Sequence, residues 1–267
     1  MTNITLGQYF PGDSIVHRLD PRTKMLTMLF YIVIVFLVKE LALFLLPFAF
    51  VIAVVLLSGV PFSYVLRSLK PLRFLLIFMF FMNLFLTPGQ TVLFEYAFLR
   101  VTEEALIQAV YISLRLVLLV GGTSLMTLTT SPIALTDGLE RLLKPLSKLK
   151  FPAHELAMMM TIALRFIPTL MEEADKIRKA QLSRGADFES GNLVNRAKSM
   201  IPILVPLFVS AFRRADELAM AMESRCYHGG EGRTRMHVLR YQSADGFAFA
   251  VTLVMGAIIV LLQAFPL

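Results

Sequence analysis

Long apolar segments constrain the fold of this chain more than any other feature. Apolar residues cluster between Met25 and Thr130 and again after Gly246, while most of the charge lies between these two regions. Hydrophobic residues make up 57% of the 267 positions, above the ~45–50% of soluble domains. Because backbone polar groups inside a bilayer must bond within their own segment, helices are expected. The sequence therefore predicts an all-α integral membrane protein with a large polar insertion, rather than a membrane-anchored globular enzyme.

Five apolar segments are predicted to be transmembrane helices. About 20 residues are needed to cross a hydrocarbon core roughly 30 Å thick. The first segment is the shortest, and a tilted or partly re-entrant helix is an alternative for it; Lys24 and Lys39 at its ends are expected to reach the two surfaces. The five segments are residues 25–38, 41–60, 72–86, 105–130 and 247–262.

Charge indicates the orientation of these helices. If the N-terminus is cytoplasmic, only Lys39 and Arg100 of the 26 lysine and arginine residues fall outside, and Arg115 lies within a span. Positive charge collects on the cytoplasmic side of membrane proteins. We therefore expect a cytoplasmic N-terminus, and the net charge of +7 reflects this topology and attraction to anionic lipid rather than to nucleic acid.

The chain is predicted to have four regions. Arg67, Lys70 and Arg73 are expected to anchor a cytoplasmic turn between the second and third spans. The regions are a cytoplasmic lead-in (1–24), four transmembrane helices (25–130), a cytoplasmic coupling domain (131–243) and a C-terminal transmembrane helix (244–267).

Three amphipathic helices are predicted in the cytoplasmic region, over residues 132–149, 154–184 and 200–225. Pro145 is expected to shorten or kink the first of them. The two longer helices begin almost entirely apolar and become charged toward their ends. This gradient predicts helices that start against the inner face of the bilayer and project away from it. The alternative is a packed helical hairpin whose apolar starts form its core.

An eleven-residue pattern occurs twice, 41 residues apart, at the ends of the two long helices. The first copy is A-D-x-I-x-x-A-x-x-S-R at 174–184, and the second is A-D-x-L-x-x-A-x-x-S-R at 215–225. Each copy ends in an arginine between small residues, namely Ser183, Arg184 and Gly185 in one and Ser224, Arg225 and Cys226 in the other. Because the rest of the chain is typical of a membrane protein, this polar duplication predicts two matching binding sites on a soluble partner.

Arginine suits such a contact because its guanidinium binds a carboxylate through two parallel hydrogen bonds. Small neighbours let another backbone approach closely. Gly185 favours the left-handed residue that closes a helix, whereas Cys226 favours it less. The alternative is that each arginine only complements its helix dipole, but two copies of an extended pattern favour docking over that explanation.

The sequence does not indicate a catalytic, nucleotide-binding or metal site in this chain. There is no phosphate-binding G-x-x-x-x-G-K-[ST] motif, and the four histidines are scattered without other ligands at metal-binding spacing. Glu172 and Glu173 are expected on a solvated, mixed-charge face. The single cysteine excludes an internal disulfide and fits a reducing compartment, and no cleavable signal peptide is evident. We therefore expect no cofactor, no metal and no enzymatic activity.

Three further segments carry a resemblance to a known family. They read GDSIVHRLDPRTK at 12–24, LTDGLE at 135–140 and ALRFIP at 163–168. Together with the two arginine tips, Ser183–Gly185 and Ser224–Cys226, they resemble the T component (EcfT) of energy-coupling factor vitamin transporters, over nearly the whole chain. The resemblance implies a helical scaffold in the bacterial cell membrane, with cytoplasmic coupling helices.

The resemblance also implies partners and roles. Arg184 and Arg225, with their neighbours Ser183, Gly185, Ser224 and Cys226, would dock two ABC-type ATPases, although serine before each arginine and cysteine after the second depart from the family's usual Ala-Arg-Gly. A membrane-embedded substrate-binding S component would dock on the apolar faces of the helices. Hydrolysis by the ATPases would then reorient that subunit for vitamin uptake. Residues expected at this second surface are Met158, Met159, Met160, Leu164, Leu204 and Phe208; ordinary core filling is the alternative for the methionines.

Two other functions remain open. A self-contained transporter or channel would use Arg115 as the polar group of its own pathway. A membrane enzyme working at the cytoplasmic surface would need a catalytic constellation that the sequence does not show. On the scaffold interpretation, substrate specificity lies in another subunit.

Overall fold

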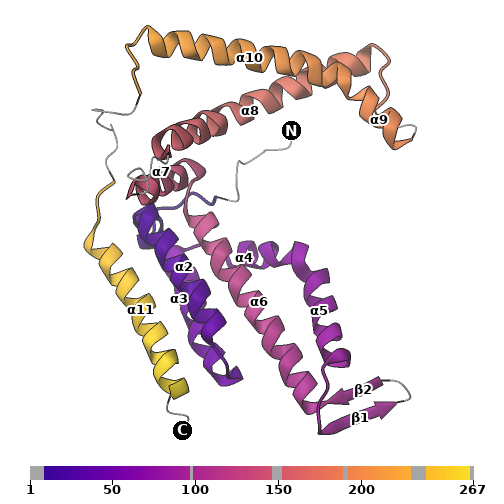
Figure 1. The fold of residues 1–267 in the computed structure, drawn as a ribbon, viewed down its shortest axis with the longest axis vertical. Coiled ribbons are helices and arrows are strands. Elements are labelled where there is room, and N and C mark those ends of the chain that lie inside the picture. The colour runs from indigo at the N-terminus through magenta and orange to yellow at the C-terminus, as the bar shows by residue number, and fades with distance from the viewer. Residues whose placement is uncertain (1–8, 97–98, 146–151, 189–191, 230–238, 265–267) are drawn as a thin grey trace. The chain divides into compact units, whose positions relative to one another are not determined.

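The structure, a computed structural model, describes residues 9–96, 99–145, 152–188, 192–229 and 239–264. These residues are almost entirely helical, and the only strands among them are the antiparallel hairpin β1 (Val92–Tyr96) and β2 (Leu99–Thr102). The chain divides into two compact units. We call the described residues 9–139 and 239–264 the membrane unit, and residues 140–229 the tip unit. The predicted all-α membrane fold is confirmed (Figure 1).

Helices of very different lengths build the membrane unit. Its longest helix, α6, packs against α2, α3, α4 and α5, and α11 packs against α2 and α3. The helices are α1 (Ile15–Arg18), α2 (Pro21–Leu37), α3 (Leu45–Ser58), α4 (Phe62–Leu69), α5 (Arg73–Leu86), α6 (Glu103–Thr129) and α11 (Ser243–Ala264), with 3₁₀ turns η1 (Leu41–Phe44) and η2 (Lys70–Leu72).

Four segments of the described chain are long and apolar enough to cross a membrane, so the protein is multi-pass. They are Leu41–Ser58, Phe62–Leu86, Glu103–Thr129 and Ser243–Ala264, and they correspond to four of the five predicted spans. The remaining prediction, 25–38, lies within α2, whose 17 residues extend only about 26 Å at 1.5 Å per residue. α2 is therefore shorter than a full perpendicular span.

The chain bends within the turn predicted from Arg67, Lys70 and Arg73, but only at Lys70–Leu72, because Arg67 already lies in a helix, α4. This short amphipathic helix buries Val65 against α6, and the 3₁₀ turn η2 then bends the chain into α5 (Figure 1). Pro71 within η2 explains the bend, since proline lacks the N–H group that would continue the helical bonding. The apolar segment Phe62–Leu86 is thus two helices joined at an angle.

The core of the membrane unit forms around α2. Tyr31 is almost fully buried, and its hydroxyl donates a 3.0 Å hydrogen bond to the Leu118 carbonyl of α6. A Cβ atom added at Gly122 would lie 2.4 Å from the Tyr31 ring, so α6 can approach this ring only with glycine there. Further fully buried side chains are Val35, Val38, Phe44, Leu128, Thr252 and Ile259.

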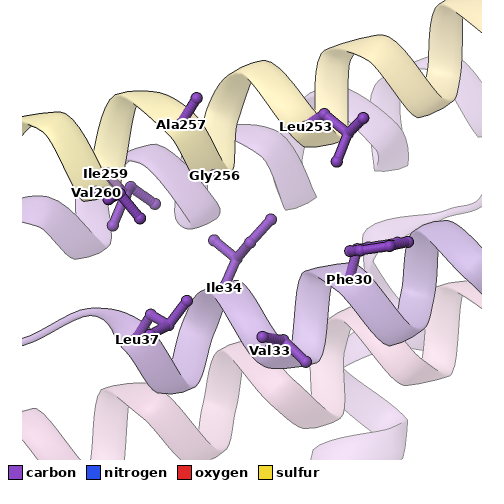
Figure 2. Close-up of a pocket in the computed structure, with 9 residues that line it drawn as sticks. All are labelled: Phe30, Val33, Ile34, Leu37, Leu253, Gly256, Ala257, Ile259 and Val260. Atoms are coloured by element: carbon purple, nitrogen blue, oxygen red, sulfur yellow. The ribbon is translucent and has the colours of Figure 1, made fainter.

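α2 and α11 leave a small apolar cavity of about 190 Å³ between them. Figure 2 shows Ile34 pointing across this space toward α11, where Gly256 provides room for it. The other lining residues are apolar too, so the cavity offers no polar group to a ligand.

A polar junction joins the start of α2 to the start of α11. The Asp20 side chain caps α2, and its two oxygens also accept from the Arg22 guanidinium. The Asp20 backbone N–H donates to Asp245 Oδ1 at 2.8 Å, while Asp245 Oδ2 accepts from the Gln242 N–H. Asp245 therefore satisfies backbone donors at both helix starts.

Lys24 belongs to the interior rather than to a membrane surface. Its Nζ donates to the carbonyls of Thr129, at 2.8 Å, and His17, at 3.1 Å, and the residue is only 7% exposed. The expectation that Lys24 reaches the surface is therefore wrong. It holds the end of α6 against the start of α2 instead.

Before α11, the described residues of the region 131–243 form one more helix than predicted. α7 (Pro132–Leu143) begins where predicted and ends two residues before Pro145, across the boundary between the two units. The two long helices are α8 (Ala153–Ser183) and α10 (Ile201–Glu223), within two residues of their predicted ends. The additional helix is α9 (Leu193–Ser199).

Candidate functional site: the two arginine tips

α8 and α10 pack against each other in opposite directions. Figure 1 shows α10 returning along α8 after α9. Side-chain contacts give the register, because partners on α10 come earlier in the chain as α8 advances. The contacts are Met158 Sδ with the Tyr227 hydroxyl (3.0 Å), Glu173 Oε2 with Arg214 Nη2 (2.9 Å) and Gln181 Nε2 with the Pro202 carbonyl (3.4 Å).

This arrangement corrects two expectations about the apolar helix starts. Because the pair is antiparallel, the start of one helix lies beside the end of the other, so both helices cannot project from one surface. The alternative, a packed hairpin, has the right packing, but the apolar start of α10 is not its core, because a stripe along α10 is exposed, with Phe208 61% exposed. The stripe comprises Ile201, Leu204, Val205, Phe208, Val209 and Phe212.

The first tip closes α8 with a Schellman motif, the double hydrogen-bonded turn that ends many helices. The Gly185 N–H donates to the Leu182 carbonyl at 3.0 Å, and the Ala186 N–H donates to the Gln181 carbonyl at 3.0 Å. Gly185 has φ +84°, in the left-handed region. The predicted glycine cap is confirmed, and it leaves Arg184 as the last residue before the chain reverses.

The second tip repeats this motif bond for bond. The Cys226 N–H donates to the Glu223 carbonyl at 2.9 Å, and the Tyr227 N–H donates to the Met222 carbonyl at 3.1 Å. Cys226 has φ 53° and is the only described non-glycine residue with positive φ. The second tip therefore adopts the same geometry as the first although it lacks the glycine, and Arg225 occupies the position of Arg184.

Both arginines face solvent at the surface of the tip unit. Arg184 and Arg225 are exposed, as are the small residues on either side of them. The hydroxyls of the neighbouring serines bond to the backbone of their own helices. The Ser183 hydroxyl donates to the Lys179 carbonyl and the Ser224 hydroxyl donates to the Ala221 carbonyl, both at 3.1 Å. Each tip thus presents one guanidinium, unhindered by its neighbours, for paired hydrogen bonds to a carboxylate.

The ion pair between Glu173 and Arg214 was not anticipated. The sequence suggested a solvated face for Glu173, yet this residue contacts α10 in the middle of the helix pair. A hydrogen bond with Ser210, followed by the Arg214 guanidinium, holds the pKa of the Glu173 carboxyl below its ordinary value against an opposing effect of burial. The 41-residue spacing of the repeat, which also separates Glu173 from Arg214, was the available signal.

The residues expected at the second docking surface do not all point outward. Met159, Met160, Leu204 and Phe208 are exposed, and Leu164 is half-buried. Met158 is half-buried too, and its sulfur accepts the hydrogen bond from Tyr227.

Arg115 has a structural role within the membrane unit. Its Nη2 donates to the carbonyls of Val38, at 3.0 Å, and Phe36, at 3.3 Å, and to the Tyr111 hydroxyl. These carbonyls belong to the end of α2, where the last C=O groups of a helix have no partner of their own. Arg115 therefore caps α2, and it is engaged in packing where a pathway residue would face open space.

The described residues contain no group of three or more histidine, cysteine or acidic side chains placed to hold a metal ion. Cys226 is a free, exposed thiol at the second tip.

Comparison with known proteins gives one consistent result. Residues 12–238 match the family model described as cobalt transport protein, CbiQ. The chain is 58% identical over 252 residues to the energy-coupling factor transporter transmembrane protein EcfT of Thermosediminibacter oceani, covering 94% of this chain and 95% of that one. It is 50% identical over 264 residues to the protein of the same name from Bacillus subtilis, covering 99% and 100%. The chain belongs to the EcfT family, the transmembrane components of energy-coupling factor transporters.

Proposed function

We propose that this chain is the scaffold through which two partner ATPases drive the movement of a substrate-binding membrane subunit. The observation that carries the proposal is the pair of matching arginine tips at opposite ends of one antiparallel helix pair. Each guanidinium would bind a carboxylate in a groove of one ATPase, with Ser183, Gly185, Ser224 and Cys226 allowing close approach. ATP hydrolysis would reside in these partners and not in this chain.

The exposed apolar side chains of α8 and α10 would form the second docking surface. A stripe of this kind on a helix normally marks a contact with another apolar surface. We propose that it receives a membrane-embedded substrate-binding subunit, through Met159, Met160, Leu204 and Phe208, with Leu164 at its edge and Met158 supporting it from within. Hydrolysis would then reorient that subunit for uptake of a vitamin or similar micronutrient.

Topology completes the proposal. The arginine-rich region 131–243 and the N-terminus would lie in the cytoplasm of a bacterial cell, as the positive-inside rule predicts. The division into a lead-in, four membrane helices, a coupling domain and a last membrane helix belongs to the same proposal. A self-contained pathway through Arg115 is less well supported, because that side chain caps α2.

Capture of partners from native membranes in mild detergent tests this function. Wild-type chain should recover two ATP-binding subunits, and Arg184→Glu/Arg225→Glu should lose both. Arg184→Lys/Arg225→Lys is the matched control for charge, and it should fall between them because lysine cannot form the paired bonds. Wild-type chain that comes out alone, or a double glutamate variant that keeps both subunits, would refute the scaffold role.

A further inference from the structure

The residues directly before the two copies of the repeat contact each other. Glu173 and Arg214 stand 41 residues apart, the spacing that also relates Arg184 to Arg225. They are thus equivalent positions, each one residue before its copy, and they bind each other at 2.9 Å. When a residue in an antiparallel helix pair contacts its own equivalent, a pseudo-two-fold axis passes through that contact.

The axis places the tips symmetrically. Arg184 follows Glu173 by eleven residues, and Arg225 follows Arg214 by eleven residues in the opposite direction. At 1.5 Å per residue each arm is about 16 Å long, so the two tips lie roughly 33 Å apart. Neither arm contains proline or glycine, since Pro168 and Pro206 both precede the contact. Two straight arms of equal length therefore extend from one point.

The residues directly before the two copies of the repeat differ in charge where the axis passes. Positions 172–173 are both glutamate, whereas positions 213–214 are both arginine. Had the two copies kept the same residue, like charges would face each other across the axis. A partly exposed ion pair adds little to stability, but opposite charges at one crossing point can select one register over its neighbours.

We propose that the Glu173–Arg214 pair is the pivot of α8 and α10, and that it sets the equal reach of Arg184 and Arg225. The pair acts through the tips and touches no partner, so both residues are positioning residues. This inference rests on the proposed docking of the tips. It adds that the contact points for the two tips lie roughly 33 Å apart.

Distances between spin labels on the two tips test the pivot directly. Cys226 is the only cysteine of the chain and is exposed, so Ser183→Cys supplies a second label at the other tip. The two spin labels are attached to the full-length chain in lipid nanodiscs, in four sequence backgrounds. They are the otherwise unchanged chain, Glu173→Arg, Glu173→Arg/Arg214→Glu and Glu172→Arg.

Glu173→Arg should broaden and shift the distance distribution, because two cations then meet on the axis. The swapped pair should restore it, and Glu172→Arg should leave it unchanged, since that exposed neighbour makes the same charge change away from the contact. An unaltered distribution in Glu173→Arg, or a swap that fails to restore it, would overturn the pivot. If Glu173→Arg does not fold, Arg214→Gln against the swapped pair gives the same comparison.

Transport assays separate this inference from the proposed function. In the reconstituted complex, Glu173→Arg should raise the ATP consumed per substrate imported, and the swapped pair should lower it again. A purely structural role would reduce the yield of complex and leave that ratio unchanged. If the tip-to-tip distances change as expected in the charge variants but the chain binds no ATPase, only the proposed function is refuted. If the chain binds both ATPases but the distances do not change in the charge variants, only the pivot is refuted.

Discussion

The closure of the second tip around Cys226 leads to a quantitative prediction. Both tips use the same two hydrogen bonds, but Cys226 adopts φ 53° with a side chain, whereas Gly185 adopts φ +84° without one. The left-handed conformation costs an L-residue roughly 1–2 kcal/mol. Glycine avoids that cost but loses about 0.4–1 kcal/mol through the greater freedom of the unfolded chain. The difference favours glycine at either tip by about 1 kcal/mol.

Cys226→Gly should therefore stabilise the second tip, and Gly185→Ala should destabilise the first. A change of about 1 kcal/mol alters the local opening equilibrium about fivefold. Hydrogen exchange reports this opening through the two amides that close the motifs. The Tyr227 amide should exchange about fivefold more slowly in Cys226→Gly, and the Ala186 amide about fivefold faster in Gly185→Ala.

Each variant contains its own control, because the amide at the unchanged tip should exchange at the wild-type rate. Faster exchange of Tyr227 in Cys226→Gly would refute the reasoning, since it would mean that the cysteine side chain stabilises the turn. A change of similar size at both tips would instead indicate global unfolding and would also contradict a local cap.

Three further outcomes follow from the contacts described above. Gly122→Ala should lower the stability of the membrane unit by about 1–3 kcal/mol and reduce its melting temperature, because the added Cβ overlaps the buried tyrosine ring; Gly121→Ala, whose Cβ would meet nothing nearer than 4.0 Å, should change it far less. Arg115→Met should cost about 1–3 kcal/mol in stability by removing the charged donor that the Phe36 and Val38 carbonyls share at the end of α2, and altered substrate selectivity at unchanged stability would contradict its capping role. Glu173 should contribute to the stability of the α8–α10 pair above the ordinary carboxyl pKa, and this contribution should be lost as pH falls through the lowered pKa. The distribution of tip-to-tip distances in the wild-type chain should therefore broaden on acidification. An equal response in Glu173→Gln would contradict the assignment of this effect to Glu173.

Local signals in the sequence predicted the long helices well. The predicted ranges 154–184 and 200–225 differ from α8 and α10 by one or two residues at each end. The apolar stripes, and the serine, arginine and glycine at the end of α8, act within a few residues of one another. Such signals can be read from one segment alone.

Features that depend on distant partners were not predictable in the same way. α4 has only eight residues between two long apolar segments, and the packing of Val65 against α6 holds it as a separate helix. The direction of α10 relative to α8 depends on contacts such as Gln181 with Pro202, which lie in separate segments. Lys24 resembled an interfacial anchor because its acceptor, the Thr129 carbonyl, lies 105 residues away.

The sequence predicted which residues belong to the site, but not how they are arranged in space. The repeat identified Arg184 and Arg225 correctly as equivalent, and the structure gives them matching caps. That the copies point in opposite directions could not be deduced, because a repeat is equally compatible with parallel and antiparallel packing. The opposite charges at 172–173 and 213–214 fit a contact between equivalent positions, but they do not distinguish the two directions.

The junction between Asp20 and Asp245 has a consequence for the order in which the protein is made. The start of α2 emerges early from the ribosome, but the carboxylate that accepts its N–H lies 225 residues later, at the start of α11. At 5–20 residues per second, roughly 10–45 seconds pass between the synthesis of the two residues. During that interval the start of α2 lacks the Asp245 carboxylate, and the junction can close only after α11 has been synthesised.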